Sequence, residues 1–176
     1  ISYAKHTSVR NVIGNISQRA DAIVVFTQLG AVELAIYAVA TIIPEQIKSS
    51  FKNLASLLLP KYAAYSDITE LKKSVPKRSL QLFLLLSVIT ILYIIVAPYV
   101  YGFLFPKYPD AVLYSQLAAL AFPTFILFIP YSILQAQLAI KVLYKLTAYS
   151  SIFQISVVLI GVLTFGLIGA IIARLI

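Results

Sequence analysis

The chain has 176 residues, of which 61% are hydrophobic and 11% are charged. Because a soluble globular domain carries about 25% charged residues, this composition excludes an ordinary soluble domain with a polar surface. Cysteine is absent and His6 is the single histidine, which excludes disulfides, thiolate sites and a histidine-based metal site. The net charge of +8 indicates cytoplasmic loops rich in Lys and Arg rather than a nucleic-acid partner.

Two helices separated by a turn at Gly30 are predicted first, over residues 9–29 and 31–59. When residues are placed 100° apart, each segment is apolar on one face and polar on the other. Both are therefore either amphipathic helices on a membrane surface or spans whose polar faces line a cavity. We interpret them as spans, because two adjacent polar stripes can together line one polar crevice. The second stripe comprises Glu33, Tyr37, Thr41, Glu45, Lys48 or Ser49, Lys52 and Ser56.

Three uncharged segments follow, over residues 79–106, 111–140 and 146–173. Each exceeds the roughly 20 apolar residues that a membrane span needs. A basic loop over residues 61–78 precedes them. Four prolines lie inside the predicted helices, namely Pro44, Pro98, Pro123 and Pro130. Each indicates a kink, which either lets the bundle change shape or is a fixed feature of its packing. The last segment contains Gly161, Gly166 and Gly169. Their spacing forms no GxxxG motif, but such small residues predict close packing between helices.

The basic residues predict the orientation of the spans. If the turns alternate between the two sides, nearly all Lys and Arg fall on one side, and only Lys107 and Arg174 fall on the other. Positive charge collects in cytoplasmic loops. We therefore expect the segment to start on the cytoplasmic side and to end outside.

Ionisable residues inside a span are costly and usually functional. We predict that Arg19, Lys48 and Lys52 form an electropositive lining for a phosphate-bearing substrate, since Arg binds phosphate bidentately and Lys acts as a point charge. The polar residues Asn15 and Gln18 share the face of Arg19. The alternative for the two lysines is that they only extend to the cytoplasmic interface.

The acidic residues of these helices are candidates for ion coupling, namely Asp21 and Glu45. Glu45 and Lys48 have the i,i+3 spacing of a helical ion pair. Asp21 and Arg19 lie about 200° apart on a helix, so each needs a partner on another helix or a hydrated cavity.

Catalytic motifs are missing from the sequence. It contains no glycine-rich phosphate loop, no GxSxG turn and no His–acid pair, and its six acidic residues form no cluster suited to Mg²⁺. We therefore predict no catalytic residue, no metal site, no cofactor and no enzyme activity.

Three stretches carry a family resemblance: NISQRADAIVVFTQLGAVELAIY over Asn15–Tyr37, LLLPKY over Leu57–Tyr62 and LFPKYPDA over Leu104–Ala111. The first joins a polar helix start and an Asp entering an apolar run to a Gly turn and a Tyr in the next helix. In order and spacing they resemble polysaccharide flippases of the multidrug/oligosaccharidyl-lipid/polysaccharide exporter superfamily.

The resemblance implies an all-α polytopic transmembrane bundle of about five spans, with residues 1–176 forming one domain. That domain would be most of one six-helix lobe, and the chain a fragment of the C-terminal lobe. The implied activity is movement of a lipid-linked oligosaccharide across the cytoplasmic (inner) membrane by alternating access. The implied partners are the lipid-linked sugar, membrane lipids and the N-terminal lobe of the same protein.

Other functions are also compatible with the sequence. An ion-coupled multidrug or small-molecule antiporter of the same superfamily would depend on Asp21 rather than on the cations. A membrane-embedded prenyl- or glycosyltransferase would need clustered acids, which this sequence lacks. A scaffold bundle without transport would have no use for Arg19 and Asp21 inside a span.

Overall fold

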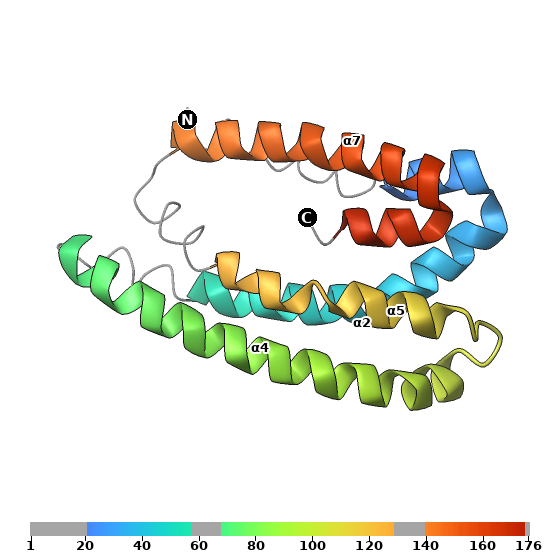
Figure 1. The fold of residues 1–176 in the computed structure, drawn as a ribbon, viewed down its shortest axis with the longest axis horizontal. Coiled ribbons are helices and arrows are strands. Elements are labelled where there is room, and N and C mark those ends of the chain that lie inside the picture. Colours follow the sequence, from blue (N-terminus) through green and yellow to red (C-terminus); the bar gives the residue numbers. More distant parts are fainter. Residues whose placement is uncertain (1–20, 58–67, 129–139, 175–176) are drawn as a thin grey trace. The chain divides into compact units, whose positions relative to one another are not determined.

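The computed structural model describes residues 21–57, 68–128 and 140–174 (Figure 1). These residues are almost all helical and include no strand, which confirms the predicted all-α class. The chain forms two compact units. We call Ile1–Val39 with Ile140–Ile176 the terminal unit, and Ala40–Ala139 the central unit. The assembly of a single membrane bundle, and its place in a six-helix lobe, remain predictions.

The first turn between helices lies at Gly30. Residues 21–29 are helical, and helix α2 follows over Ala31–Leu57, running from the terminal unit into the central unit. Gly30 has φ = 96°, and its N–H donates to the carbonyl of Phe26 at 3.0 Å. Glycine enters this left-handed conformation without steric cost, so the local sequence ends one helix and lets the next begin.

Helix α7 spans Ile140–Ala173 in the terminal unit and is broken at Gly166 (φ = 60°, ψ = −136°). The segment after Gly166 folds back beside the preceding turns (Figure 1). There the backbones of Gly161 and Gly169 meet, and a Cβ added to Gly161 would lie 2.7 Å from the Gly169 carbonyl oxygen. Close packing at Gly161 and Gly169 is confirmed. The predicted span over 146–173 coincides with a segment that is long and apolar enough to cross a membrane, Lys145–Ala173, although the helix is broken at Gly166.

The central unit contains the rest of α2, helix α4 (Ile68–Leu104), helix α5 (Ala111–Ala119) and the 3₁₀ helix η1 (Phe122–Leu127). One cluster of its core consists of four buried side chains, Leu86, Ala119, Phe122 and Phe125. Phe51 of α2 and Tyr93 of α4 pack against this cluster. The rings of Phe51 and Phe125 lie 6.0 Å apart, and those of Tyr93 and Phe122 meet edge to face at 5.5 Å. Such aromatic pairs stabilise the contact beyond their buried area.

Helix α4 already begins at Ile68, within the predicted loop over residues 61–78, whereas its part that is apolar enough to cross a membrane begins at Ser79, where the span was predicted to begin. The part of α4 before Ser79 contains Glu, Leu and Lys, which are strong helix formers, and they extend the apolar helix at its start.

In the predicted span over residues 111–140, α5 ends at Ala119 and the 3₁₀ helix η1 follows, so its described part is helical but is not one continuous α-helix. Pro123 has no N–H to donate to an α-helical partner. Around it the chain tightens into i→i+3 bonds, such as that from the Thr124 N–H to the Ala121 carbonyl at 3.0 Å. Residues 129–139, the rest of the predicted span, lie outside the described ranges.

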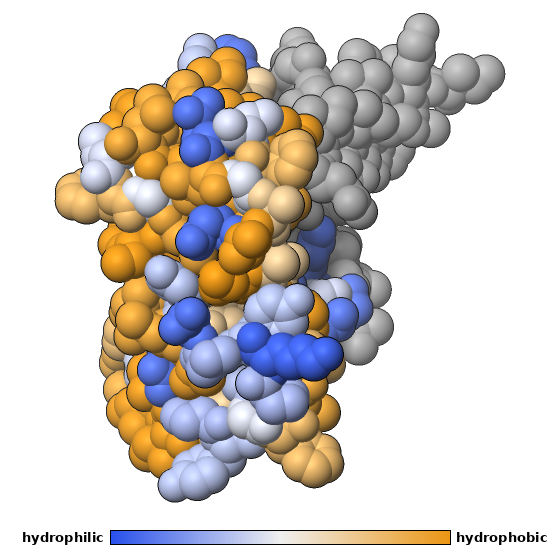
Figure 2. Space-filling view, turned by 90° about the vertical axis from the view of Figure 1, so that its right-hand side faces the viewer, coloured by the Kyte–Doolittle hydropathy of each residue, from blue (hydrophilic) through white to orange (hydrophobic). Residues whose placement is uncertain are grey.

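Two polar side chains of α2 are buried, while some of its apolar side chains are exposed. Tyr37 and Thr41, from the predicted polar stripe, are buried, whereas Val32 and Leu54 are exposed. On the face drawn in Figure 2, hydrophobic residues make up most of the described surface, with smaller hydrophilic areas between them. Of the predicted polar stripe, Tyr37 and Thr41 therefore face inward, whereas Glu33 is half-buried and Lys52 is exposed.

Two of the described helical segments, Ser79–Leu104 and Lys145–Ala173, are long and apolar enough to cross a membrane. Of their most apolar windows, 17% and 33% are buried. The core helix of a soluble protein would instead be mostly buried. Length, apolarity and low burial together support a membrane location for this chain.

Candidate functional site

The candidate site is built around Asp21, which lies in the helical segment 21–29 of the terminal unit. Its side chain is 2% exposed. One carboxylate oxygen, Oδ1, accepts a hydrogen bond from the backbone N–H of Ala22 at 2.7 Å. An acidic residue this deeply buried needs further partners, because a buried unpaired charge is strongly unfavourable.

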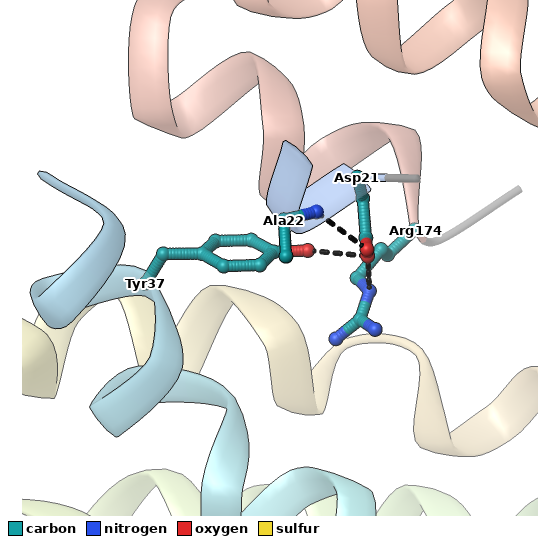
Figure 3. Close-up of polar contacts among 4 residues, drawn as sticks. All are labelled: Asp21, Ala22, Tyr37 and Arg174. Carbon is teal, nitrogen blue, oxygen red and sulfur yellow. Dashed lines mark hydrogen bonds and ion pairs between the residues drawn. The ribbon is translucent and has the colours of Figure 1, made fainter. Parts of the chain in front are cut away.

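Those partners come from two other parts of the same unit (Figure 3). The hydroxyl group of Tyr37, on α2, donates to Asp21 Oδ2 at 2.6 Å. Arg174, directly after α7, approaches the same oxygen with Nε at 2.6 Å. The Arg174 guanidinium carbon also lies 5.5 Å from the centre of the Tyr37 ring. Three separate parts of the chain thus meet at one carboxylate.

The electrostatics of the site follow from its burial. The Arg174 side chain is 19% exposed, so both charges of the pair are largely removed from water. A buried pair is retained only when good geometry and additional hydrogen bonds offset the cost of desolvation. Here the two short contacts to Oδ2 and the Ala22 N–H at Oδ1 meet that requirement, and the Tyr37 ring adds a cation–π contact.

The position of Arg174 depends on the break in α7. Gly166 turns the chain, and the close approach of Gly161 and Gly169 lets the last segment fold back against the preceding turns. Helix α7 ends at Ala173, and the Arg174 N–H still donates to the carbonyl of Ile171 at 3.1 Å. The glycines therefore set the direction in which the arginine leaves the helix.

Of the predicted substrate-binding residues, Asn15, Gln18 and Arg19 lie outside the described residues. Lys48 and Lys52 lie on the part of α2 that belongs to the central unit, where Lys48 is half-buried and Lys52 is exposed. Their role in binding a substrate stays a prediction.

The two predicted ion-coupling residues also lie in different units. Asp21 is the centre of the network described above, and Glu45 is half-buried on α2 in the central unit. Their role in ion coupling stays a prediction. The partner expected for Asp21 on another helix is Arg174.

Two residues of the network were not predicted as site residues. Tyr37 was assigned only to the polar stripe of its helix, and Arg174 was treated as a terminal charge that marks the outer side. The signal for Arg174 is a single charge directly after a long uncharged segment, in a chain whose Asp21 needs a partner within an apolar region. Compared with family models, with curated proteins and with solved structures, the chain gives no match.

Proposed function

We propose that this chain is part of a polytopic transporter of the cytoplasmic membrane that moves a lipid-linked saccharide precursor by alternating access. In this proposal it is a flippase and not an enzyme, and an N-terminal lobe of the same protein completes the pathway. The support comes from two sources. One is the order of the three family-like stretches, and the other is the combination of exposed apolar surfaces with a buried charged network.

The observation that carries the proposal is the network of Asp21, Tyr37 and Arg174. Ionisable groups are rare in apolar segments that face lipid, and where they occur they commonly mark pathways for substrates or ions. A purely structural bundle gains little from such a pair, because well-packed apolar residues of similar volume are often equally stable. A transporter, in contrast, needs polar groups that can exchange partners between its two open states.

The substrate in this proposal carries a diphosphate attached to a sugar. Arg19, Lys48 and Lys52 would bind the phosphate oxygens, with Asn15 and Gln18 as neutral hydrogen-bonding partners. The lipid tail would remain in the bilayer beside the exposed apolar faces.

We expect Arg19→Ala and Lys52→Ala, made in the full-length protein, to abolish glycan export at an unchanged level in the membrane. Each charge-assisted hydrogen bond contributes about 1.5–3 kcal/mol, which corresponds to a loss of about tenfold or more in binding. The measurement is surface glycan in cells that depend on this protein, with protein quantified in the membrane fraction. Lys107→Ala, an exposed cation outside the helices, is the matched control. Normal export from both variants would contradict the cavity assignment.

An ion-coupled small-molecule antiporter of the same superfamily is the second candidate, and the burial of Asp21 favours it. A carboxylate held by an arginine can exchange that partner for a proton or a metal cation. An antiporter would lose ion-driven efflux in Asp21→Asn and keep it in Lys52→Ala. A flippase that binds its substrate through the basic residues would instead lose glycan export in Lys52→Ala and keep it in Asp21→Asn.

Orientation gives a separate test of the membrane proposal. Because residues 1–176 contain no cysteine, a single cysteine introduced into them is their one site for thiol labelling, and the parent protein without it gives the background. We expect Lys107→Cys to react with a membrane-impermeant maleimide in intact cells, and Lys73→Cys to react only after the membrane is opened. Labelling of Lys73→Cys in intact cells would reverse the predicted orientation. Labelling of both would argue against a membrane boundary between them.

A further inference from the structure

Pro44 in α2 and Pro98 in α4 each leave a carbonyl group without its usual α-helical partner. In α2, Pro44 has no N–H, so the Ala40 carbonyl four residues earlier loses its α-helical hydrogen bond. That carbonyl instead accepts a hydrogen bond from the hydroxyl group of Tyr101, on α4, at 3.0 Å. Ala40 is fully buried and Tyr101 is 1% exposed, so water does not replace this bond.

The same arrangement occurs in α4. Pro98 removes the partner of the Ile94 carbonyl, and the side-chain amide of Gln116, on α5, donates to that oxygen at 2.8 Å. The two freed carbonyls are thus both satisfied by side chains from a neighbouring helix. A helix interrupted by proline keeps its backbone groups satisfied in an apolar environment only through such contacts.

The two contacts are connected in series. Tyr101 lies three residues after Pro98, on the part of α4 that any bend at Pro98 would displace. Gln116 donates to the carbonyl freed by Pro98, and Tyr101 donates to the carbonyl freed by Pro44. A bend at Pro98 would therefore move the hydroxyl group that bonds the carbonyl freed by Pro44.

We propose that Pro44 and Pro98 are coupled hinges. The hydrogen bonds from Tyr101 to Ala40 and from Gln116 to Ile94 are their latches, meaning contacts that keep α2 and α4 from bending at these prolines. In this arrangement α2, α4 and α5 do not bend independently. Release of Gln116 from Ile94 frees α4 to bend, and the displaced Tyr101 then frees α2. The coupling is a property of the central unit alone and does not depend on the substrate or on the charged network in the terminal unit.

The test measures the bending of α2 directly. Cysteines replace Val32 and Leu54, which are both exposed and lie on either side of Pro44, and spin labels on them report a distance distribution in the reconstituted full chain. We expect Tyr101→Phe to broaden this distribution. Loss of the hydrogen bond to the Ala40 carbonyl, at ordinary strength, raises the bent population by about threefold to tenfold. Gln116→Leu should broaden it less, because its effect passes through α4.

Repeating Tyr101→Phe in a Pro44→Ala background shows whether its effect comes from the lost hydrogen bond to Ala40 or from a general loss of packing. Alanine at this position would supply the missing N–H to the Ala40 carbonyl, so Tyr101→Phe should no longer broaden the distribution. Tyr99→Phe and Gln81→Leu, at exposed positions of α4, are the matched controls and should leave it unchanged. Equal broadening by Tyr101→Phe in both backgrounds, or none in the native background, would overturn the proposal. Absence of any effect from Gln116→Leu would overturn the coupling between the hinges.

Discussion

Replacing Arg174 with methionine is expected to lower the free energy of unfolding by about 3–5 kcal/mol, because it leaves a buried carboxylate without its counter-charge. Methionine preserves most of the apolar stem of the side chain, so the loss reports on the charge rather than on volume. The measurement is unfolding of the full chain in detergent micelles or bicelles. Lys145→Met, at an exposed position of α7, is the control and should change stability by about 0.5 kcal/mol or less.

The double variant Asp21→Leu, Arg174→Met sharpens this result. Removing both charges also removes the desolvation penalty, so stability should recover to near that of the native chain. If Arg174→Met and Lys145→Met have equal effects, the pair does not contribute as the geometry indicates. A double variant that is stable but inactive in transport would assign the pair a role in function. A double variant that is both stable and active would make it a structural element only.

The second large effect is expected from Gly169→Ala. The added Cβ would overlap the backbone carbonyl of Gly161, and a backbone contact cannot rotate away as a flexible side chain can. Overpacking of this kind lowers stability by about 1–3 kcal/mol, and a contact between two backbones lies at the upper end of that range. The returning segment of α7 would also separate, so the Asp21–Arg174 pair should be lost with it. Unfolding measurements on the single variants and on the combination with Arg174→Met detect both effects.

The control for this prediction is Gly102→Ala in α4, where an added Cβ meets no atom within 4 Å. That variant should be neutral or more stable by up to about 1 kcal/mol, because alanine restricts the unfolded chain. If Arg174→Met lowers stability as much in the Gly169→Ala background as in the native chain, the fold-back does not position the arginine. Equal effects of the two glycine substitutions would contradict the close contact.

Local signals were sufficient to predict several features of this chain. Gly30 ends one helix and permits the next, because its conformation depends mainly on its own lack of a side chain. The polar stripe of α2 was predicted from the helical period, and its members Tyr37 and Thr41 are buried. The need of Asp21 for a distant partner followed from the cost of a buried charge. Each of these inferences depends on a few neighbouring residues or on one solvation argument.

Other features could not be read in this way. The apolar run after Ala111 is continuous in composition, and nothing in its hydrophobicity indicates that α5 ends at Ala119. Pro123 was noted as a possible kink, but a proline in a helix can either bend it or end it, and the surrounding contacts select the outcome. The early start of α4 at Ile68 was missed because charged residues were interpreted as a loop, although several of them are strong helix formers.

Composition and hydrophobic periodicity thus establish the helical class and the apolar character of this chain, because both are sums over many residues that no single contact changes. Which partners its polar groups contact was decided by the tertiary structure. Arg174 reaches Asp21 only through the break at Gly166, and Tyr101 and Gln116 reach the carbonyls freed by Pro44 and Pro98 only across neighbouring helices. Contacts between residues so distant in the chain depend on how the backbone turns, and hydrophobic pattern carries no information about those turns.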